Sequence, residues 1–127
     1  MKRFALMLSG LLFLCGCGGG GTPTPTPVVT ISITTPTTAQ TVPVNGTLAI
    51  TAAVSGTSNT AVTWTVNNIT NGNSTYGTIS GSGLSVTYTA PAAVPSPATF
   101  NVTATSAADT TKSASASVTI TPATTTC

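Results

Sequence analysis

The sequence predicts an all-β fold, a two-sheet sandwich of about seven short strands, from three observations. Of the 127 residues, 30 are threonine, whose branched side chain fits a pleated strand better than a helix. Beyond residue 28, apolar residues alternate with Thr, Ser or other small residues, which is the period of a strand with one buried face. Clusters of Gly, Pro and Asn interrupt this alternation, and no helical spacing follows residue 17.

The alternation divides the chain into strands separated by turns. Pro36 ends the first expected strand, and Pro43 fits only an edge or a bend. Asn45-Gly46 predicts a turn, and longer loops are expected at 56–59, 67–74 and 91–97. The expected strands are 29–34, 48–54, 62–66, 76–79, 84–88, 100–104 and 114–120.

The apolar face of each strand predicts the core between the two sheets. Trp64 shares its face with Val62 and Val66, so we expect its ring to pack inside rather than to stand exposed as a platform for sugars. We expect Tyr88 to be half-buried, with its hydroxyl reaching backbone, and Tyr76 to be the more exposed tyrosine. The predicted core residues are Trp64, Val62, Val66, Ile50, Phe100, Val102 and Val118.

The scarcity of charge excludes most chemistry. Only 3% of the residues are charged and there is no histidine. Asp109 is the single acidic side chain, so no acid–base pair and no cluster of carboxylates for a cation can form. Lys2, Arg3 and Lys112 are too few for a nucleic-acid interface. We therefore expect no catalytic residue, no metal site, no cofactor and no nucleic-acid partner, and interpret Asp109 and Lys112 as a turn with an exposed ion pair.

The N-terminus has the pattern of an export signal. Two basic residues precede an apolar run at 4–14, which is too short to span a membrane permanently. The next residues, Leu14-Cys15-Gly16-Cys17, resemble the lipobox of bacterial lipoproteins. This resemblance implies a signal peptide at 1–16, cleavage after Gly16 and acylation of Cys17, which would hold the protein on a membrane. Gly18 stands where an Asp would resemble the inner-membrane retention signal, which favours the outer membrane or cell surface.

Residues 17–27 predict a flexible linker between the anchor and the domain. Four glycines at 18–21 have no side chains to pack, and the alternating Thr-Pro run at 22–27 favours polyproline II. Fully extended, such a linker reaches on the order of 30 Å. We expect it to lift the domain clear of the lipid headgroups.

A series of short motifs runs in order through residues 28–121: VTIS (29–32), GT (46–47), SGTSN (55–59), VTW (62–64), GTI (77–79), YTAPA (88–92), VTATS (102–106) and KSASA (112–116). Together they resemble a bacterial immunoglobulin-like domain of the group 2 type. The resemblance implies an immunoglobulin-like sandwich, found singly or in arrays on bacterial surface proteins. A Thr-rich tail follows at 122–127.

These observations favour a non-enzymatic surface protein that serves adhesion or a structural role in the cell envelope, through sheet edges or loops. One alternative is a carbohydrate-binding module, for which Tyr76 is the one available exposed aromatic. A second is the first module of a longer repeat adhesin. Cys127 would be a lone thiol that could link a dimer, or an accident of where the sequence ends.

Overall fold

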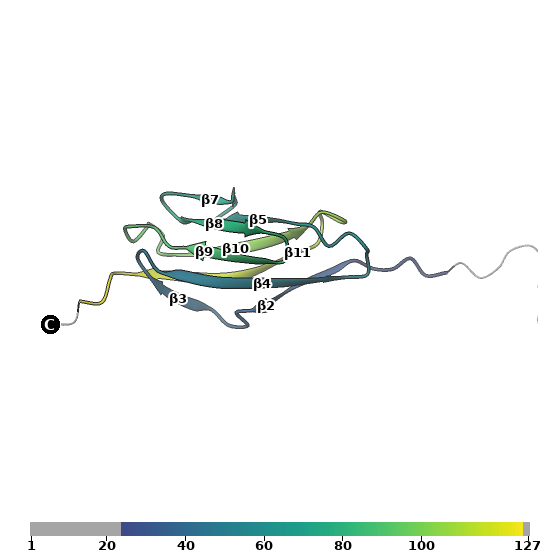
Figure 1. Cartoon of the computed structure of the whole chain (residues 1–127), viewed down its shortest axis with the longest axis horizontal. Coiled ribbons are helices and arrows are strands. Elements are labelled where there is room, and N and C mark those ends of the chain that lie inside the picture. The colour runs from purple at the N-terminus through teal and green to yellow at the C-terminus, as the bar shows by residue number, and fades with distance from the viewer. Residues whose placement is uncertain (1–23, 126–127) are drawn as a thin grey trace, which may run out of the picture.

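A computed structural model of the chain describes residues 24–125, which form two facing β-sheets and contain no helix (Figure 1). The all-β sandwich expected from the alternation is therefore confirmed. The predicted signal peptide at 1–16, the predicted acylation site Cys17 and the terminal Cys127 lie outside the described residues.

The first sheet has five strands in the order β3-β11-β10-β5-β6. All of its neighbours are antiparallel except β3 and β11, which run parallel. Its strands are β3 (Gln40–Pro43), β5 (Val62–Val66), β6 (Ile69–Thr70), β10 (Thr99–Ser106) and β11 (Ser113–Thr121). Pro43 closes β3 at the sheet edge, where the missing N–H of proline costs no ladder bond.

The second sheet also has five strands, in the order β2-β4-β9-β8-β7, and is antiparallel throughout. Its strands are β2 (Thr30–Thr35), β4 (Thr47–Ser55), β7 (Gly72–Asn73), β8 (Gly77–Ser82) and β9 (Ser85–Thr89). A register shift between Ile33 and Thr35 gives β2 a bulge just before Pro36 ends it.

The strand order is that of an immunoglobulin-type sandwich. In such folds the first, second, fifth and fourth strands form one sheet, and the third, sixth and seventh form the other. Strands β2-β4-β9-β8 and β5-β10-β11 reproduce these two sets. Antibody domains carry a cystine between the second and sixth strands, whereas inward positions of β4 and β10 here hold Ile50 and Val102.

Residues 24–125 contain ten strands rather than about seven, and part of the difference lies in the segment 67–74. We expected a loop there, but it contains β6 and β7, which belong to different sheets. Asn71 lies between them: its N–H donates to the Trp64 carbonyl at 3.0 Å, and its carbonyl accepts the Ile79 N–H at 2.9 Å. The crossover at Asn71 therefore connects the two sheets by hydrogen bonds. Strands β6 and β7 have two residues each, which is too short to show an alternating pattern in the sequence.

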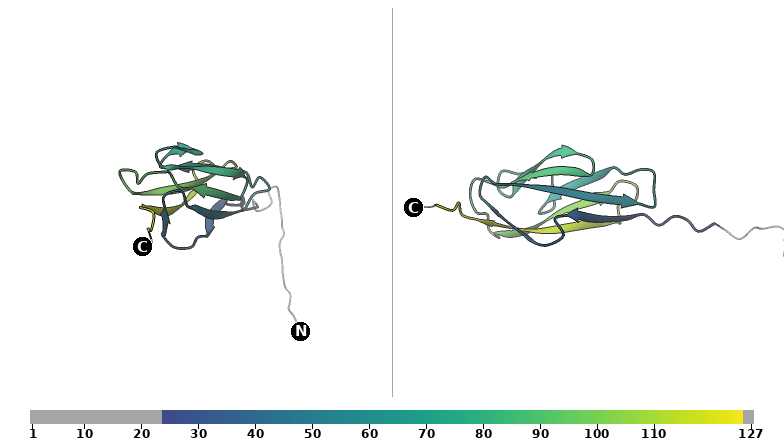
Figure 2. Two further views of the ribbon diagram at one scale, coloured as in Figure 1. Left: turned by 60° about the vertical axis from the view of Figure 1, so that its left-hand side comes forward. Right: turned by 60° about the horizontal axis from the view of Figure 1, so that its bottom comes forward.

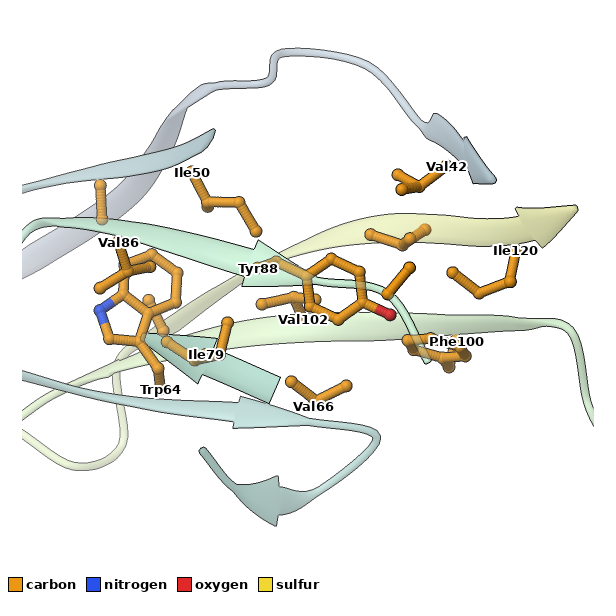
Figure 3. Packing of buried hydrophobic residues seen from close by; sticks show 14 residues of the cluster. Val42, Ile50, Trp64, Val66, Ile79, Val86, Tyr88, Phe100, Val102 and Ile120 are labelled. Atoms are coloured by element: carbon orange, nitrogen blue, oxygen red, sulfur yellow. The ribbon is translucent and has the colours of Figure 1, made fainter. Parts of the chain in front are cut away.

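The core fills the space between the two sheets (Figure 3). Six of the seven predicted core residues are buried, each with less than a tenth of its surface exposed. Val62 differs: it is half-buried, because it is the first residue of β5. Tyr88 also differs, since the structure buries it completely. The buried predicted residues are Ile50, Trp64, Val66, Phe100, Val102 and Val118.

The chain enters the sandwich at one end and leaves it at the other (Figures 1 and 2). The linker end carries the 56–61 and 107–112 loops, joined by a hydrogen bond from the Ala107 N–H to the Ala61 carbonyl. The far end carries the 91–98 loop and the turn after Pro43. A hydrogen bond from the Asn45 N–H to the Pro91 carbonyl joins these two segments. The expected loop at 56–59 thus lies at the linker end, and the expected loop at 91–97 lies at the far end.

Candidate interaction site

The charged residues of the domain form a turn. The Asp109 carboxylate accepts the Thr111 N–H at 3.0 Å and the Thr111 hydroxyl at 2.6 Å. These hydrogen bonds, aided by the positive charge of Lys112, hold the pKa of Asp109 below its ordinary value. Among residues 24–125 no three His, Cys, Asp or Glu side chains come together in a way that could hold a metal ion. Asp109 therefore closes the β10–β11 hairpin, with Thr111 as its partner.

The outer face of the second sheet is covered by hydroxyl and methyl groups. One row across the sheet consists of Thr47, Thr89 and Thr78 on three adjacent strands. The outward positions of β2, β4, β8 and β9 are otherwise Thr, Ser and Ala. This face carries no formal charge, so a partner would meet it through hydrogen bonds and van der Waals contacts.

Tyr76 lies at the far end and is half-buried. Its ring meets Phe100 edge-on, with centroids 5.3 Å apart and planes at 74°, and its hydroxyl donates to the Ser96 carbonyl at 3.3 Å. A flat platform for a sugar needs an open ring face, and this ring is engaged with its neighbours. The carbohydrate alternative stays a prediction without an aromatic row to support it in the described domain.

Tyr88 lies in the middle of the core, between the Trp64 end and the Phe100 end (Figure 3). Its hydroxyl donates to the Tyr76 carbonyl at 2.5 Å, which fulfils the expectation that it reaches backbone. Burial raises the pKa of Tyr88 to about 12, because the phenolate would lose its hydration. Tyr88 is therefore a structural residue: its hydroxyl links β9 to Tyr76, the residue directly before β8.

A groove runs along the side of the sandwich where the edges of the two sheets face each other. Strand β11 pairs with β3 only over Val118–Thr121, so within the described domain its first half, Ser113–Ser117, has no strand on that side. Two adjoining hollows of about 330 Å³ and 300 Å³ lie between this half of β11 and β2. We call them together the open groove; its lining includes Ile31, Ile33, Pro36, Ala39, Ala114 and Ser117.

The backbone of β11 points hydrogen-bonding groups into the open groove. The Ile120 N–H donates to the Ala98 carbonyl, and the Lys112 carbonyl accepts the Ser106 N–H, so even-numbered residues face β10. Because this direction alternates along a strand, Ser113 and Ser115 turn their N–H and C=O groups away from β10. The sequence pattern does not reveal this unpaired edge, since it depends on where β3 starts to pair.

Comparison of the sequence with models of known protein families and with the curated proteins finds no match. Within the part of the chain that the structure describes, none of the elements is a helix of the length and apolar character that crossing a membrane requires.

Proposed function

We propose that this chain is a non-enzymatic lipoprotein that displays one bacterial immunoglobulin-like domain at the cell surface or outer membrane. The observation that carries the proposal is the order of segments: a lipobox-like Leu14-Cys15-Gly16-Cys17, a Gly and Thr-Pro linker, and a sandwich whose first strand begins at Thr30. Acyl chains on Cys17 would anchor the protein, since each buried CH₂ contributes about 0.8 kcal/mol. The linker would then hold the domain away from the lipid.

Contact with a partner is the role that the geometry of the domain supports. A tether at the N-terminus leaves the far end of the sandwich, with its 91–98 loop and the turn after Pro43, directed away from the membrane. The hydroxyl-rich surface, whose charged side chains among residues 24–125 are Asp109 and Lys112, offers no long-range electrostatic steering, which suits short-range adhesion or packing within the envelope. The domain would act through loops and sheet edges.

Metabolic labelling with palmitate tests the anchor. In a bacterial host we expect the wild-type chain and Cys15→Ser to incorporate the label and to fractionate with membranes. Cys17→Ser should lose both properties while its domain still folds, because residue 17 lies well before the first strand. Equal labelling of Cys17→Ser, or no labelling of the wild-type chain, contradicts the proposed anchor.

A further inference from the structure

We propose that Asn71 is a site of spontaneous chemical modification: with water as the co-reactant, its side-chain amide converts to a carboxylate, and it does so before that of Asn45. Asn71-Gly72 and Asn45-Gly46 are the two Asn-Gly pairs of the chain. Glycine has no Cβ to hinder the approach of its backbone nitrogen to the preceding side chain, so both pairs have the same intrinsic reactivity. The difference between them comes from the fold, and it does not depend on the proposed anchor.

The reaction has two steps. The Gly72 backbone nitrogen loses its proton to hydroxide and attacks Cγ of Asn71. A bond from this nitrogen to Cγ forms as the Cγ–Nδ2 bond breaks, and the side-chain nitrogen takes a proton from water and leaves as ammonia. Water then opens the resulting succinimide ring at either of its carbonyl carbons, which leaves aspartate or isoaspartate at position 71. The chain gains water and loses ammonia, with no oxidation or reduction.

The folded backbone holds both pairs in an unreactive conformation. Both asparagines are exposed, and both have a left-handed backbone, with φ of 58° at Asn71 and 62° at Asn45. In this conformation the nitrogen of the next residue points away from the asparagine Cβ, so the ring cannot close. Each pair therefore reacts only when its segment opens and the backbone rotates about the Cα–C bond of the asparagine.

Backbone hydrogen bonds hold the Asn45 turn closed. The Gly46 N–H, whose nitrogen would attack, donates to the Pro43 carbonyl at 2.9 Å. The Gly46 carbonyl accepts the Ala90 N–H at 2.8 Å, and the Asn45 N–H donates to the Pro91 carbonyl at 3.0 Å. Rotation at Asn45 moves Gly46, so it must break the bonds on both sides of this glycine together.

The attacking nitrogen of the Asn71 pair is held less firmly. The Asn71 carbonyl accepts the Ile79 N–H of β8. Because the C=O and N–H of one trans peptide point in opposite directions, the Gly72 N–H points away from β8. On that side β7 has no neighbouring strand in the described domain, since it is the last strand of its sheet. Strand β7 also pairs with β8 at only two residues, so rotation at Asn71 needs only a short edge to separate.

The product weakens the crossover between the sheets. The Asn71 N–H donates to the Trp64 carbonyl in the first sheet, and the Asn71 carbonyl accepts the Ile79 N–H in the second. Isoaspartate adds one carbon to the backbone between these two groups, so they no longer match both partners. It also adds a carboxylate to residues 24–125, whose one acidic side chain is Asp109. The domain therefore loses stability as it ages.

Peptide mapping after incubation in water labelled with heavy oxygen tests the order of reaction. Each event takes one oxygen atom from water, so mass spectrometry of the fragments measures it at each asparagine. The full chain is incubated under mildly alkaline conditions, folded in detergent micelles or unfolded in urea. In the folded chain Asn71 should gain label at least about fivefold faster than Asn45. In urea the two rates should agree within about twofold, because neither pair is then held by the fold.

Two variants assign the label to its residue. Asn71→Gln should lose the label at position 71, because glutamine would have to close a larger ring, and should keep the label at Asn45. Asn45→Gln is the matched control and should leave labelling of Asn71 unchanged. Circular dichroism reports whether each variant folds, and the map of the wild-type chain keeps the test valid if one does not.

Thermal unfolding tests the effect on the crossover. An isoaspartyl methyltransferase identifies the isoaspartate fraction of the aged chain after ion-exchange separation. This fraction should melt about four degrees or more below the fresh chain, because it loses hydrogen bonds between the sheets. Asn71→Asp adds the carboxylate without lengthening the backbone and should melt within about two degrees of the fresh chain.

The proposal is overturned if Asn45 gains label as fast as Asn71 in the folded chain, or if Asn71 stays unlabelled while both pairs react in urea. A preference for Asn71 that persists in urea would also overturn it, because the fold would then not be its cause. An isoaspartate fraction that melts with the fresh chain would refute the weakened crossover. Cys17→Ser should age as the wild-type chain does, so a failure of palmitate labelling leaves these outcomes unchanged.

Discussion

Trp64 joins the two sheets at the linker end of the core. It lies on β5 with 3% of its surface exposed, and its indole N–H donates to the Gly83 carbonyl at 2.9 Å. Gly83 belongs to the turn between β8 and β9, in the other sheet. A single side chain therefore combines a large apolar contact with a hydrogen bond between the layers.

We expect Trp64→Ala to lower the free energy of unfolding by about 3–5 kcal/mol, because it removes this contact and leaves a cavity. Trp64→Phe keeps most of the volume but loses the hydrogen bond to Gly83, so its cost should be smaller. Far-UV circular dichroism in urea measures both, since Trp64 is the only tryptophan and fluorescence would be lost. A melting midpoint for Trp64→Ala within about two degrees of wild type would contradict this role.

Tyr88 makes the stability of the domain sensitive to alkali. Its folded pKa of about 12 lies above the ordinary value of 10.0, because the buried site disfavours the phenolate. The unfolded chain therefore ionises first as the pH rises, so the contribution of Tyr88 is complete below about pH 10 and is lost progressively up to about pH 12. Urea unfolding at a series of pH values should show this decline.

Tyr88→Phe should remove this part of the alkaline decline and cost about 1 kcal/mol at neutral pH, because the Tyr76 carbonyl loses its donor. Tyr76→Phe is the matched control, since it keeps Tyr88 and the decline that Tyr88 causes. An alkaline decline of equal size in Tyr88→Phe and in the wild-type chain would show that another group is responsible.

At the scale of elements, the sequence predicts the long strands well and the short ones poorly. Strands β4, β5, β9, β10 and β11 coincide with the alternating segments, because each buries one face over five or more residues. Strands β6 and β7 have two residues each, and their pairing depends on partners distant in sequence. For the same reason the sequence does not indicate the open groove. The residues of Ser113–Ser117 alternate in the same way whether or not a strand pairs with them on that side.

Gly77, the first residue of β8, has a left-handed backbone and no room for a side chain. Its φ is 97°, and a Cβ atom there would lie 2.4 Å from the Thr89 carbonyl oxygen. Gly83 also has a positive φ, 78°, but a Cβ atom there would have no atom within 4 Å. Substitutions at Gly77 and Gly83 therefore separate two contributions to the free energy of unfolding, the penalty of a left-handed backbone and the penalty of a steric clash.

We expect Gly83→Ala to cost about 1–2 kcal/mol, the usual penalty of a left-handed backbone for a residue with a Cβ. Gly77→Ala should cost at least about twice as much, because it adds the clash with Thr89 to the same penalty. Thermal unfolding followed by circular dichroism compares the two. Equal melting temperatures would mean that β8 and β9 move apart easily at this point.

At the scale of the whole molecule, the position of the two termini gives the domain a direction. The linker joins β2 at one end, and β11 carries the chain through nine residues to the other end. At about 3.3 Å per residue, this strand separates the two ends by about 30 Å. If Cys17 is acylated, the 56–61 loop faces the membrane and the 91–98 loop faces outward.

Energy transfer to the lipid tests this direction. One dye is attached at Ser58→Cys or at Val94→Cys, both exposed positions, in a chain that also carries Cys127→Ser. In vesicles that contain an acceptor lipid, the dye at position 58 should transfer energy more efficiently than the dye at position 94, because it lies at the tethered end. Cys17→Ser should abolish transfer from both positions. Equal transfer from 58 and 94 in the acylated chain would indicate that the sandwich lies on its side, with the open groove and both sets of loops at the same height above the lipid.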